Sequence, residues 1–223
     1  MTRPLRARAR QVTDVLTRHY PGATVTLTHQ APWELLVGAI LASQCTDERV
    51  NRITPDLFAR FPGPQAMAGA DQEELEQLIR SCGLYRAKAR ALRGTGQIVA
   101  ERHGGSVPST REELMALPGV GRKIANLIMG DAFGAQAIVV DTHCARISRL
   151  LGFTDSDKPD RIERDLEEYV PREAWTRWGH LMVAHGRALC RARCRLCFEC
   201  PVRLQCRYGM ALDARRAAEG GCV

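Results

Sequence analysis

Apolar residues recur at helical spacing along most of this chain of 223 residues. Side chains three and four positions apart lie on one face of an α-helix. That spacing occurs in Ile124, Leu127 and Ile128, in Ile147, Leu150 and Leu151, and in Ile162, Leu166, Tyr169 and Val170. The segment 33–42, WELLVGAILA, is almost entirely apolar and predicts a buried helix. The chain is therefore predicted to be mostly α.

Several residues mark where these helices begin and end. Asp71 precedes an acidic first turn and predicts a helix that stops at Gly83. Thr110, three residues before Glu113, has the spacing of a capping box, and Pro118 is expected to end that helix. The best strand candidate is TVTLT, residues 24–28, which is short and isolated. No internal repeat or low-complexity linker interrupts the pattern.

The charge of the chain indicates a polyanionic partner. The formal net charge is +7, which suits nucleic acid and equally describes a solvated basic surface. Of 32 basic residues only Lys88, Lys123 and Lys158 are lysines. Arginine can bind two phosphate oxygens at once, so its general use here makes each lysine worth examining.

The ends and the cysteines of the chain indicate an intracellular protein. The basic start, MTRPLRARARQ, is not followed by the apolar stretch of a signal peptide, and no apolar run is long enough to span a bilayer. We therefore expect a cytoplasmic, nucleoid-associated protein of a prokaryote. Thiols stay reduced there, so nine cysteines predict ligands, core residues or reactive groups and not a set of disulfides.

The segment LPGVGRKIANLI, residues 117–128, predicts a tight turn between two helices. Gly119 and Gly121 allow its backbone to approach another molecule closely. The following helix starts at once, so its unpaired N–H groups would point out of the turn and could bind a phosphate. An ordinary helix–helix turn has the same pattern when it is considered alone.

Lys123 stands in the first turn of that second helix, where a cation is disfavoured by about 0.3–1 kcal/mol. The helix dipole and partial burial would both favour the neutral amine that a nucleophile needs. An exposed lysine that binds phosphate is the alternative. Asp141 follows three apolar residues and precedes a helix, as an N-cap would. If its carboxylate faces Lys123 across a cleft, the two side chains would suit attack by the lysine at the anomeric carbon of a sugar.

Taken together, LPGVGRK, AFG, VVDTH and the cysteine-rich tail resemble endonuclease III, a family of helix-hairpin-helix (HhH-GPD) DNA glycosylases. The resemblance extends from about residue 28 to residue 208. It implies two helical domains with DNA in the cleft between them. Residues 25–135 would form a six-helix domain with the hairpin. Residues 1–24 and 136–223 would form a discontinuous domain with an iron–sulfur cluster loop at 190–206.

The same resemblance assigns roles to individual residues. Lys123 is the expected nucleophile, which forms a Schiff base with C1′ of the damaged nucleotide, and Asp141 the catalytic carboxylate. Gln44 would fill the gap left by the flipped base, or simply end a buried helix. Leu84 would act as a wedge against the opposite strand, or belong to the core. The remaining DNA-binding residues are expected to be Gly119, Val120, Gly121, Arg122, Arg193 and Arg195.

Five cysteines crowd the tail CRARCRLCFECPVRLQC. Cys190, Cys194 and Cys197 match a pattern of radical S-adenosylmethionine enzymes, which need a strand-rich barrel that this sequence does not predict. Omitting Cys194 leaves Cys190, Cys197, Cys200 and Cys206, four thiolates that could hold a four-iron cluster or a zinc ion. Spacing alone does not decide between these metals. The resemblance implies a 4Fe–4S cluster held by the four cysteines that remain when Cys194 is omitted. Cys194 would then be a spare thiol, or it could substitute for one of the ligands.

The other cysteines and the arginines of the tail have simpler interpretations. Cys45, Cys82 and Cys144 are expected to be small core residues, and Cys222 has no partner pattern. Four arginines surround the expected ligands and would either hold DNA phosphates or form a solvated face. They are Arg191, Arg193, Arg195 and Arg203.

The resemblance implies a monomeric bifunctional DNA glycosylase and AP lyase. It would remove oxidised pyrimidines from double-stranded DNA and cleave abasic sites by β-elimination. One alternative is a monofunctional mismatch, adenine or alkylation glycosylase. The adenine enzymes carry a glutamate where this chain has GAILASQ, and they lack the lysine at 123. The other is a non-enzymatic iron–sulfur protein that only binds DNA, which would need neither Lys123 nor Asp141.

Overall fold

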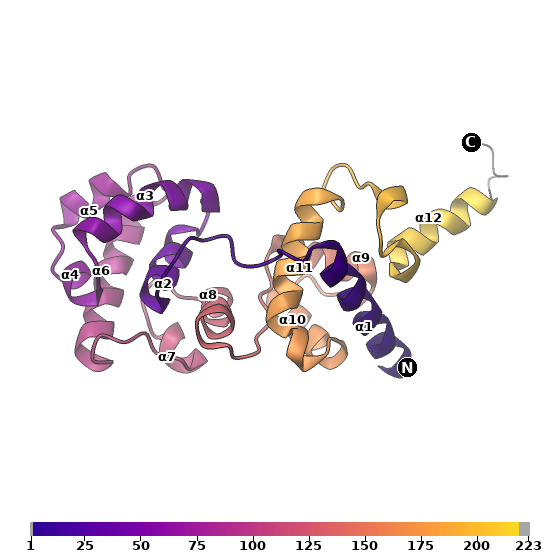
Figure 1. Cartoon of the computed structure of the whole chain (residues 1–223), viewed down its shortest axis with the longest axis horizontal. Coiled ribbons are helices and arrows are strands. Elements are labelled where there is room, and N and C mark those ends of the chain that lie inside the picture. The colour runs from indigo at the N-terminus through magenta and orange to yellow at the C-terminus, as the bar shows by residue number, and fades with distance from the viewer. Residues whose placement is uncertain (1, 219–223) are drawn as a thin grey trace. The chain divides into compact units, whose positions relative to one another are not determined.

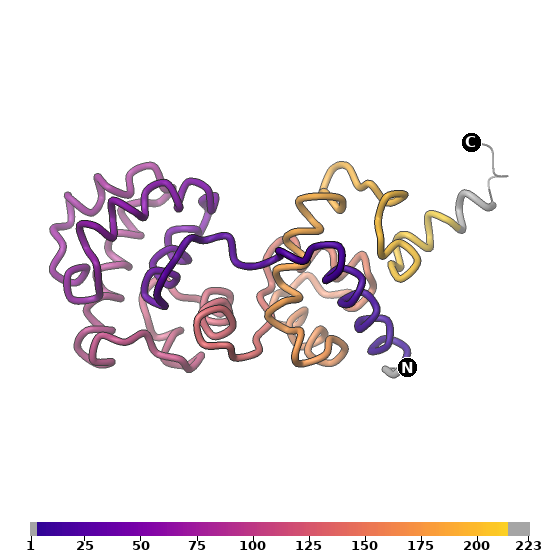
Figure 2. Tube along the Cα trace, viewed as in Figure 1, coloured from indigo at the N-terminus to yellow at the C-terminus, as the bar shows by residue number. Residues whose placement is uncertain are grey.

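The computed structural model describes residues 2–218, and these residues are mostly helical (Figures 1 and 2). Within them no strand forms, and the one β-bridge joins Cys190 to Arg195. The prediction of an all-α protein is confirmed. Among the same residues, no helix combines the length and apolar character that crossing a bilayer requires. Cys222 lies outside the described residues.

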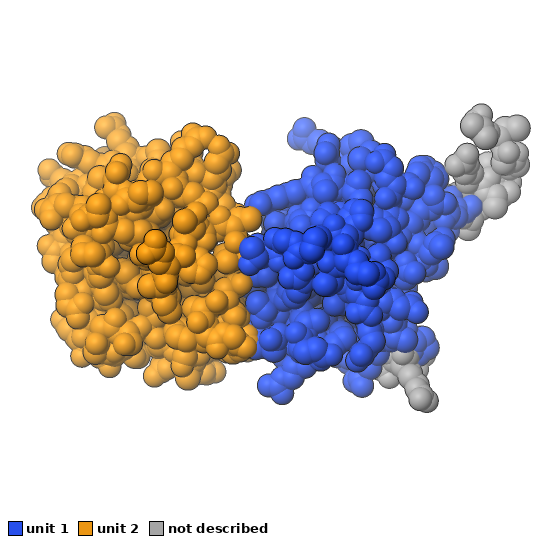
Figure 3. Space-filling view, in the orientation of Figure 1, with its two compact units in different colours: residues 1–24, 136–223 blue, residues 25–135 orange. Residues whose placement is uncertain are grey.

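The chain divides into two compact units, each with its own hydrophobic core (Figure 3). Unit 1 combines residues 1–24 with residues 136–223, and unit 2 contains residues 25–135. The core of unit 1 thus joins segments that are more than a hundred residues apart in sequence. Arg177 contributes to this by donating hydrogen bonds to the carbonyl oxygens of Ala23 and Pro21 at 3.2 and 3.0 Å.

Unit 2 is built around α2 (Pro32–Leu41), which is the helix predicted from the apolar run. All residues from Leu35 to Leu41 are buried, and α2 packs against helices α3, α6 and α8. The other elements are α3 (Asp47–Arg60), α4 (Pro64–Ala68), α5 (Gln72–Leu78), α6 (Tyr85–Arg102), α7 (Arg111–Met115), α8 (Arg122–Leu127) and a π-helical turn, η1 (Ile128–Ala132). The close approach of α4 to α6 requires Gly96, because a Cβ there would lie 2.8 Å from the carbonyl oxygen of Pro64.

The predicted helix starts in unit 2 are confirmed, whereas one predicted end is wrong. The Asp71 carboxylate caps α5 by accepting hydrogen bonds from the amides of Glu73 and Glu74 at 3.0 and 2.9 Å. The Thr110 hydroxyl accepts one from the amide of Glu113 at 3.3 Å. However, α5 ends at Leu78 and not near Gly83. A turn begins earlier because Ile79 and Cys82 both enter the core.

Unit 1 contains the longer C-terminal helices. They are α1 (Thr2–His19), α9 (Thr142–Leu151), α10 (Pro159–Tyr169), α11 (Trp175–Ala188) and α12 (Arg207–Ala218), with short 3-10 turns at Arg172–Ala174, Cys197–Glu199 and Arg203–Gln205. Helix α1 packs against α10 and α11, and α9 packs against α10, α11 and α12. Trp178 is fully buried in this core.

The strand predicted at residues 24–28 does not form. The side chain of Asn51, on α3, satisfies the backbone of this segment instead. Its Nδ2 donates to the carbonyl oxygen of Thr26 at 2.8 Å, and its Oδ1 accepts from the amide of Thr28 at 2.9 Å. An extended segment with no neighbouring strand is thus held by one asparagine.

Candidate functional site

The segment 117–121 of unit 2, called the hairpin turn below, joins α7 to α8 and leaves its backbone accessible. Gly119 has φ of 79°, a left-handed conformation that favours glycine, and a Cβ there would lie 3.1 Å from Cβ of Ala91. Gly121 is the N-cap residue of α8, and a Cβ there would meet no atom within 4 Å. The first amides of α8 therefore lie beside open space.

Buried contacts hold the hairpin turn in place. The hydroxyl of Thr95, on α6, donates a hydrogen bond to the carbonyl oxygen of Pro118 at 2.9 Å. The guanidinium of Arg111 on α7 donates to Oδ1 of Asn126 on α8 at 3.0 Å. Val120 is buried in the core, so of the predicted DNA-binding residues it can offer only its backbone.

Lys123 is exposed in the first turn of α8. The expectation of partial burial is therefore wrong. An exposed amine beside a phosphate-accessible backbone can reach a bound nucleotide.

Gln44 and Leu84 adopt an unusual backbone conformation. They have φ of 54° and 59°, and no other residues except glycines have positive φ among those that the structure describes. This conformation costs a non-glycine residue about 1–2 kcal/mol. Leu84 is 60% exposed, which excludes the alternative that it belongs to the core, and Gln44 is exposed just beyond the end of α2.

The two strained residues belong to turns that lie side by side within unit 2. A Cβ at Gly83 would lie 3.5 Å from the carbonyl oxygen of Gln44. Unit 2 therefore presents an exposed amide side chain and an exposed apolar side chain from neighbouring turns. This pair has the chemistry required to fill a gap in a base stack and to press against a base.

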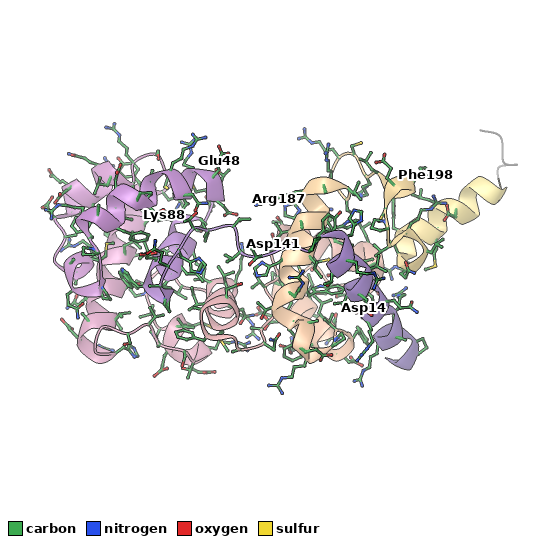
Figure 4. The ribbon with its side chains drawn as sticks, in the orientation of Figure 1. Asp14, Glu48, Lys88, Asp141, Arg187 and Phe198 are labelled. Atoms are coloured by element: carbon green, nitrogen blue, oxygen red, sulfur yellow. The ribbon has the colours of Figure 1, made fainter. Side chains whose placement is uncertain are left out.

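Asp141, in unit 1, is the N-cap residue of α9 (Figure 4). Its Oδ1 accepts a hydrogen bond from the amide of Cys144 at 2.7 Å. The capping role anticipated from the sequence is thus present in the structure. The prediction that Cys144 and Cys82 are core residues is confirmed, whereas Cys45 is only partly buried.

Four cysteines of the tail line one cavity in unit 1, and we call them the cavity cysteines: Cys190, Cys197, Cys200 and Cys206. Leu150, Leu151 and Val202 are among the residues that complete the lining. Cys194 does not line this cavity and is exposed. Among the residues that the structure describes, no group of three or more His, Cys, Asp or Glu side chains is placed to hold a metal ion.

The chemistry of the cavity fits a cationic metal group. Burial raises the pKa of Cys190 and Cys197, and it is the main cause that raises the pKa of Cys200 to about 11. The negative charge of the other cavity cysteines raises the pKa of Cys200 further. Four partly buried thiolates around one cavity would be costly without a cation, so a metal cluster would supply the charge that they need.

Further side chains hold the cavity cysteines, and the sequence interpretation missed them. Arg146 on α9 donates to the carbonyl oxygen of Cys190 at 2.7 Å. Nε2 of the buried His185 lies 3.5 Å from Sγ of Cys200, and its Nδ1 lies 3.0 Å from the hydroxyl of Tyr20. Burial lowers the pKa of His185 to about 4. The position of His185, five residues before the first cysteine, was the available signal.

The arginines of the tail differ in their availability. Arg193 is exposed, whereas Arg195 is partly buried with its guanidinium 5.3 Å from the ring centre of Tyr208. Arg203 pairs with Asp213, with Nε and Oδ2 at 2.9 Å. Of the four arginines expected to hold DNA phosphates or to form a solvated face, Arg203 is thus already paired with a carboxylate.

Comparison with known proteins identifies the family of the chain. Residues 37–172 match the family model of the HhH-GPD superfamily of base excision DNA repair proteins. Endonuclease III of Synechocystis sp. is 46% identical over 200 residues, which cover 89% of this chain and 91% of that protein. The chain belongs to the endonuclease III family. It is accordingly a DNA glycosylase and AP lyase of base excision repair, and the predicted family and activity are confirmed.

Two solved structures of endonuclease III bound to DNA are similar to this chain. A non-covalent complex has a TM-score of 0.87 at 40% identity, covering 94% of this chain and 98% of that one. A trapped covalent intermediate described as an estranged-adenine complex has a TM-score of 0.85 at 40% identity, covering 92% and 98%. DNA is therefore the partner of this endonuclease III family member, and the binding-only alternative is set aside.

Proposed function

We propose that this chain removes oxidised pyrimidines from double-stranded DNA and cleaves the resulting abasic site through a Schiff base on Lys123. The observation that carries the proposal is the exposed amine of Lys123 at the start of α8, beside the accessible hairpin turn. The solved complex of a 40% identical relative is a covalent protein–DNA intermediate, which supports a reaction through a nucleophilic side chain.

The proposed reaction begins when Nζ of Lys123 attacks C1′ of the damaged nucleotide. The bond between C1′ and the base breaks, and the base leaves with a proton. The amine then gives up one proton, the bond between C1′ and O4′ opens as O4′ takes up a proton, and an iminium that keeps one N–H forms between Nζ and C1′. Removal of a proton from C2′ expels the 3′ phosphate by β-elimination. Water finally hydrolyses the iminium and frees the lysine.

Asp141 has the chemistry to assist these steps. A carboxylate near C1′ would stabilise the positive charge that develops on the sugar, and it could move protons to and from the reacting atoms. Oδ1 already accepts the amide of Cys144, so the cap holds the carboxylate in a fixed orientation. In this proposal the cap and the catalytic group are therefore the same side chain.

DNA would be held by several features of the two units. The backbone of Gly119, Val120 and Gly121, with Arg122, would bind a phosphate at the start of α8. Gln44 would occupy the gap left by the extruded base and Leu84 would press on the opposite strand, in keeping with their exposure. Arg193 and Arg195 would contact further phosphates. We expect the protein to act as a monomer in the bacterial cytoplasm, at the nucleoid.

The cavity cysteines would hold a 4Fe–4S cluster, one thiolate for each iron. The cluster would cross-link residues 190–206, which bury few apolar side chains. His185 and Arg146 would keep Cys200 and Cys190 in place from outside the set. We assign the cluster a structural role in presenting Arg193 and Arg195, and no step of the reaction depends on it.

Borohydride trapping on abasic duplex DNA tests the proposed function. Reduction converts a Schiff base into a stable covalent complex, which wild-type protein should form and Lys123→Gln should not. Lys158→Gln is the matched control because it removes one charge from another exposed lysine. Trapping and cleavage by Lys123→Gln at the wild-type level would disprove the assignment. A modest loss of DNA affinity in both variants is expected from the lost charge alone.

A further inference from the structure

Three contacts connect the turn that carries Leu84 (residues 80–84) with residues 42–49, which comprise the turn that carries Gln44 (residues 42–46) and the start of α3. The first is the approach of Gly83 to the carbonyl oxygen of Gln44 described above. The second joins Sγ of Cys45 to Sγ of Cys82, at 3.6 Å. The third joins the guanidinium of Arg49 to the carbonyl oxygen of Ser81, at 3.2 Å. The two turns therefore form one connected structure.

Lys88 makes hydrogen bonds to both sides of this structure. It lies on α6 and is only 5% exposed (Figure 4). Its Nζ donates to the carbonyl oxygen of Leu41, the last residue of α2, at 2.9 Å. Its backbone amide donates to the carbonyl oxygen of Leu84 at 3.1 Å. A single residue is thus bonded to the chain just before Gln44 and to Leu84 itself.

The physical chemistry of the end of α2 explains why a lysine suits this position. The last carbonyls of a helix have no partner within the helix and carry partial negative charge. Helix α2 has no basic residue in its own last turn. The ammonium of Lys88, from α6, provides the missing donor and the missing positive charge. Burial lowers the pKa of Lys88, so placing an amine there is costly, and an apolar residue would pack without that cost.

We propose that Lys88 is a positioning residue, which fixes the end of α2 against the start of α6 so that Gln44 and Leu84 enter the DNA as one element. The inference rests on the proposed function, because it takes Gln44 and Leu84 as the residues that occupy the opened base stack. Both hold a left-handed backbone that an unrestrained turn would abandon. Lys88 acts through these two residues and does not touch the substrate.

The test compares a substrate that needs insertion into a base stack with one that does not. The first is a duplex with a single 5-hydroxyuracil, and the second is a single strand with one abasic site. Lys88→Met keeps the length of the side chain but removes its donor and charge. We expect excision from the duplex to fall about 10- to 100-fold, as when a positioned group is displaced. Borohydride trapping on the single strand should stay within about twofold of wild type, because Lys123 is untouched.

Controls separate positioning from general damage to the fold. Arg90→Met removes a charge from an exposed position of the same helix and should match wild type on both substrates. If Lys88→Met lowers both activities equally, it acts through stability and the inference is wrong. If Lys88→Met shows no cooperative thermal transition, Arg49→Met is the second test, because it removes the third contact from an exposed position. It should also lower excision from the duplex and leave trapping on the single strand unchanged, but the loss of excision should be smaller. Equal loss on both substrates in Arg49→Met would also overturn the inference.

A second comparison separates failure of this inference from failure of the proposed function. Gln44→Ala with Leu84→Ala should reproduce the loss on the duplex, and adding Lys88→Met to that pair should lower excision no further. If the pair loses duplex excision while Lys88→Met does not, only the role of Lys88 is wrong. If the pair matches wild type, the proposed roles of Gln44 and Leu84 fail, and the role of Lys88 fails with them.

Discussion

The hairpin segment, residues 117–128, and the cysteine segment, residues 190–206, are both short and both carry proposed functional groups, but they are stabilised differently. In the hairpin segment Leu117, Val120 and Ala125 are buried in the core of unit 2. In the cysteine segment Val202 is fully buried, at 1% exposed, whereas Phe198 and Leu204 are 61% and 72% exposed. The first is stabilised by core packing. The second has thiols around a cavity where a core would otherwise be.

This difference indicates which side chains of each segment can be replaced without a large loss of stability. A segment held by packing and by hydrogen bonds such as Thr95 to Pro118 distributes its stability over many small contributions. A segment held by four ligands concentrates its stability in those four side chains. We therefore expect that Lys123, the proposed nucleophile, can be replaced without harm to the fold, whereas replacement of a proposed ligand should disorganise the arginines that the segment carries.

The largest effect should follow Cys197→Ser. Three thiolates leave one iron without its protein ligand, so the variant should lose the ~4 irons per chain expected of wild type. The free energy of unfolding of unit 1 should fall by several kcal/mol, because cluster binding is coupled to folding. Iron analysis and hydrogen exchange measure both effects. Amides of residues 190–206 should lose protection, and those of residues 117–128 should keep theirs.

Cys45→Ser is the matched control, because Cys45 is a partly buried cysteine of unit 2 and does not line the cavity. It should retain the iron. Equal loss of protection in both segments of Cys197→Ser would contradict the contrast between them. Zinc in place of iron in the wild-type protein would contradict the proposed cofactor while leaving the ligand set intact.

The second largest effect is expected of Asp141→Asn. Asparagine caps helices about as well as aspartate, so the free energy of unfolding should stay within about 0.5 kcal/mol of wild type. Excision should fall about 100-fold, because the carboxylate that assists proton transfer is lost. Asp71→Asn is the control, since Asp71 is likewise an N-cap aspartate, that of α5, and has no proposed role in the reaction. Wild-type excision by Asp141→Asn would show that the residue is a cap and nothing more.

The sequence predicted the fold well where local signals decide structure. Apolar spacing located the buried α2, and the caps at Asp71 and Thr110 are present. The prediction failed where tertiary contacts determine the local structure. Residues 24–28 have the composition of a strand, but no neighbouring strand exists and Asn51 binds their backbone instead. The end of α5 depends on the burial of Ile79 and Cys82, which no local pattern reveals.

The candidate site was predictable only as far as its motifs are continuous in sequence. The hairpin and the cysteine set each lie within one short segment, so spacing reveals them. Lys88 and His185 belong to no such motif. Each contacts a residue far along the chain, Lys88 through a hydrogen bond to Leu41 and His185 through a contact with Cys200. Only the rarity of lysine in this chain pointed to Lys88. The strained backbone at Gln44 likewise depends on packing that a sequence does not display.

A smaller effect is expected of Thr95→Val, which tests whether the hairpin segment depends on distributed contacts. Valine keeps the shape of threonine but leaves the carbonyl of Pro118 without its donor, at a cost of about 1–3 kcal/mol. Thermal unfolding measures this loss. Thr13→Val is the control, because the buried Thr13 donates to a helical carbonyl of α1 that already has a partner. A loss of several kcal/mol in Thr95→Val, or of equal size in both variants, would argue against distributed stability.

The smallest effect is expected of Cys194→Ser, and it tests the boundary of the ligand set. Cys194 is exposed and does not line the cavity, so its replacement should leave the iron content and the unfolding of unit 1 unchanged. Cys206→Ser, by contrast, removes a cavity cysteine whose Sγ lies 3.3 Å from the carbonyl oxygen of Leu150 on α9, and it should lose the cluster. Iron analysis of the two variants in parallel gives opposite results if the cavity defines the ligands. The reverse pattern, with iron lost from Cys194→Ser and kept in Cys206→Ser, would make Cys190, Cys194, Cys197 and Cys200 the ligands. The cysteine segment would then have to refold around a different set of thiols from those that its cavity brings together.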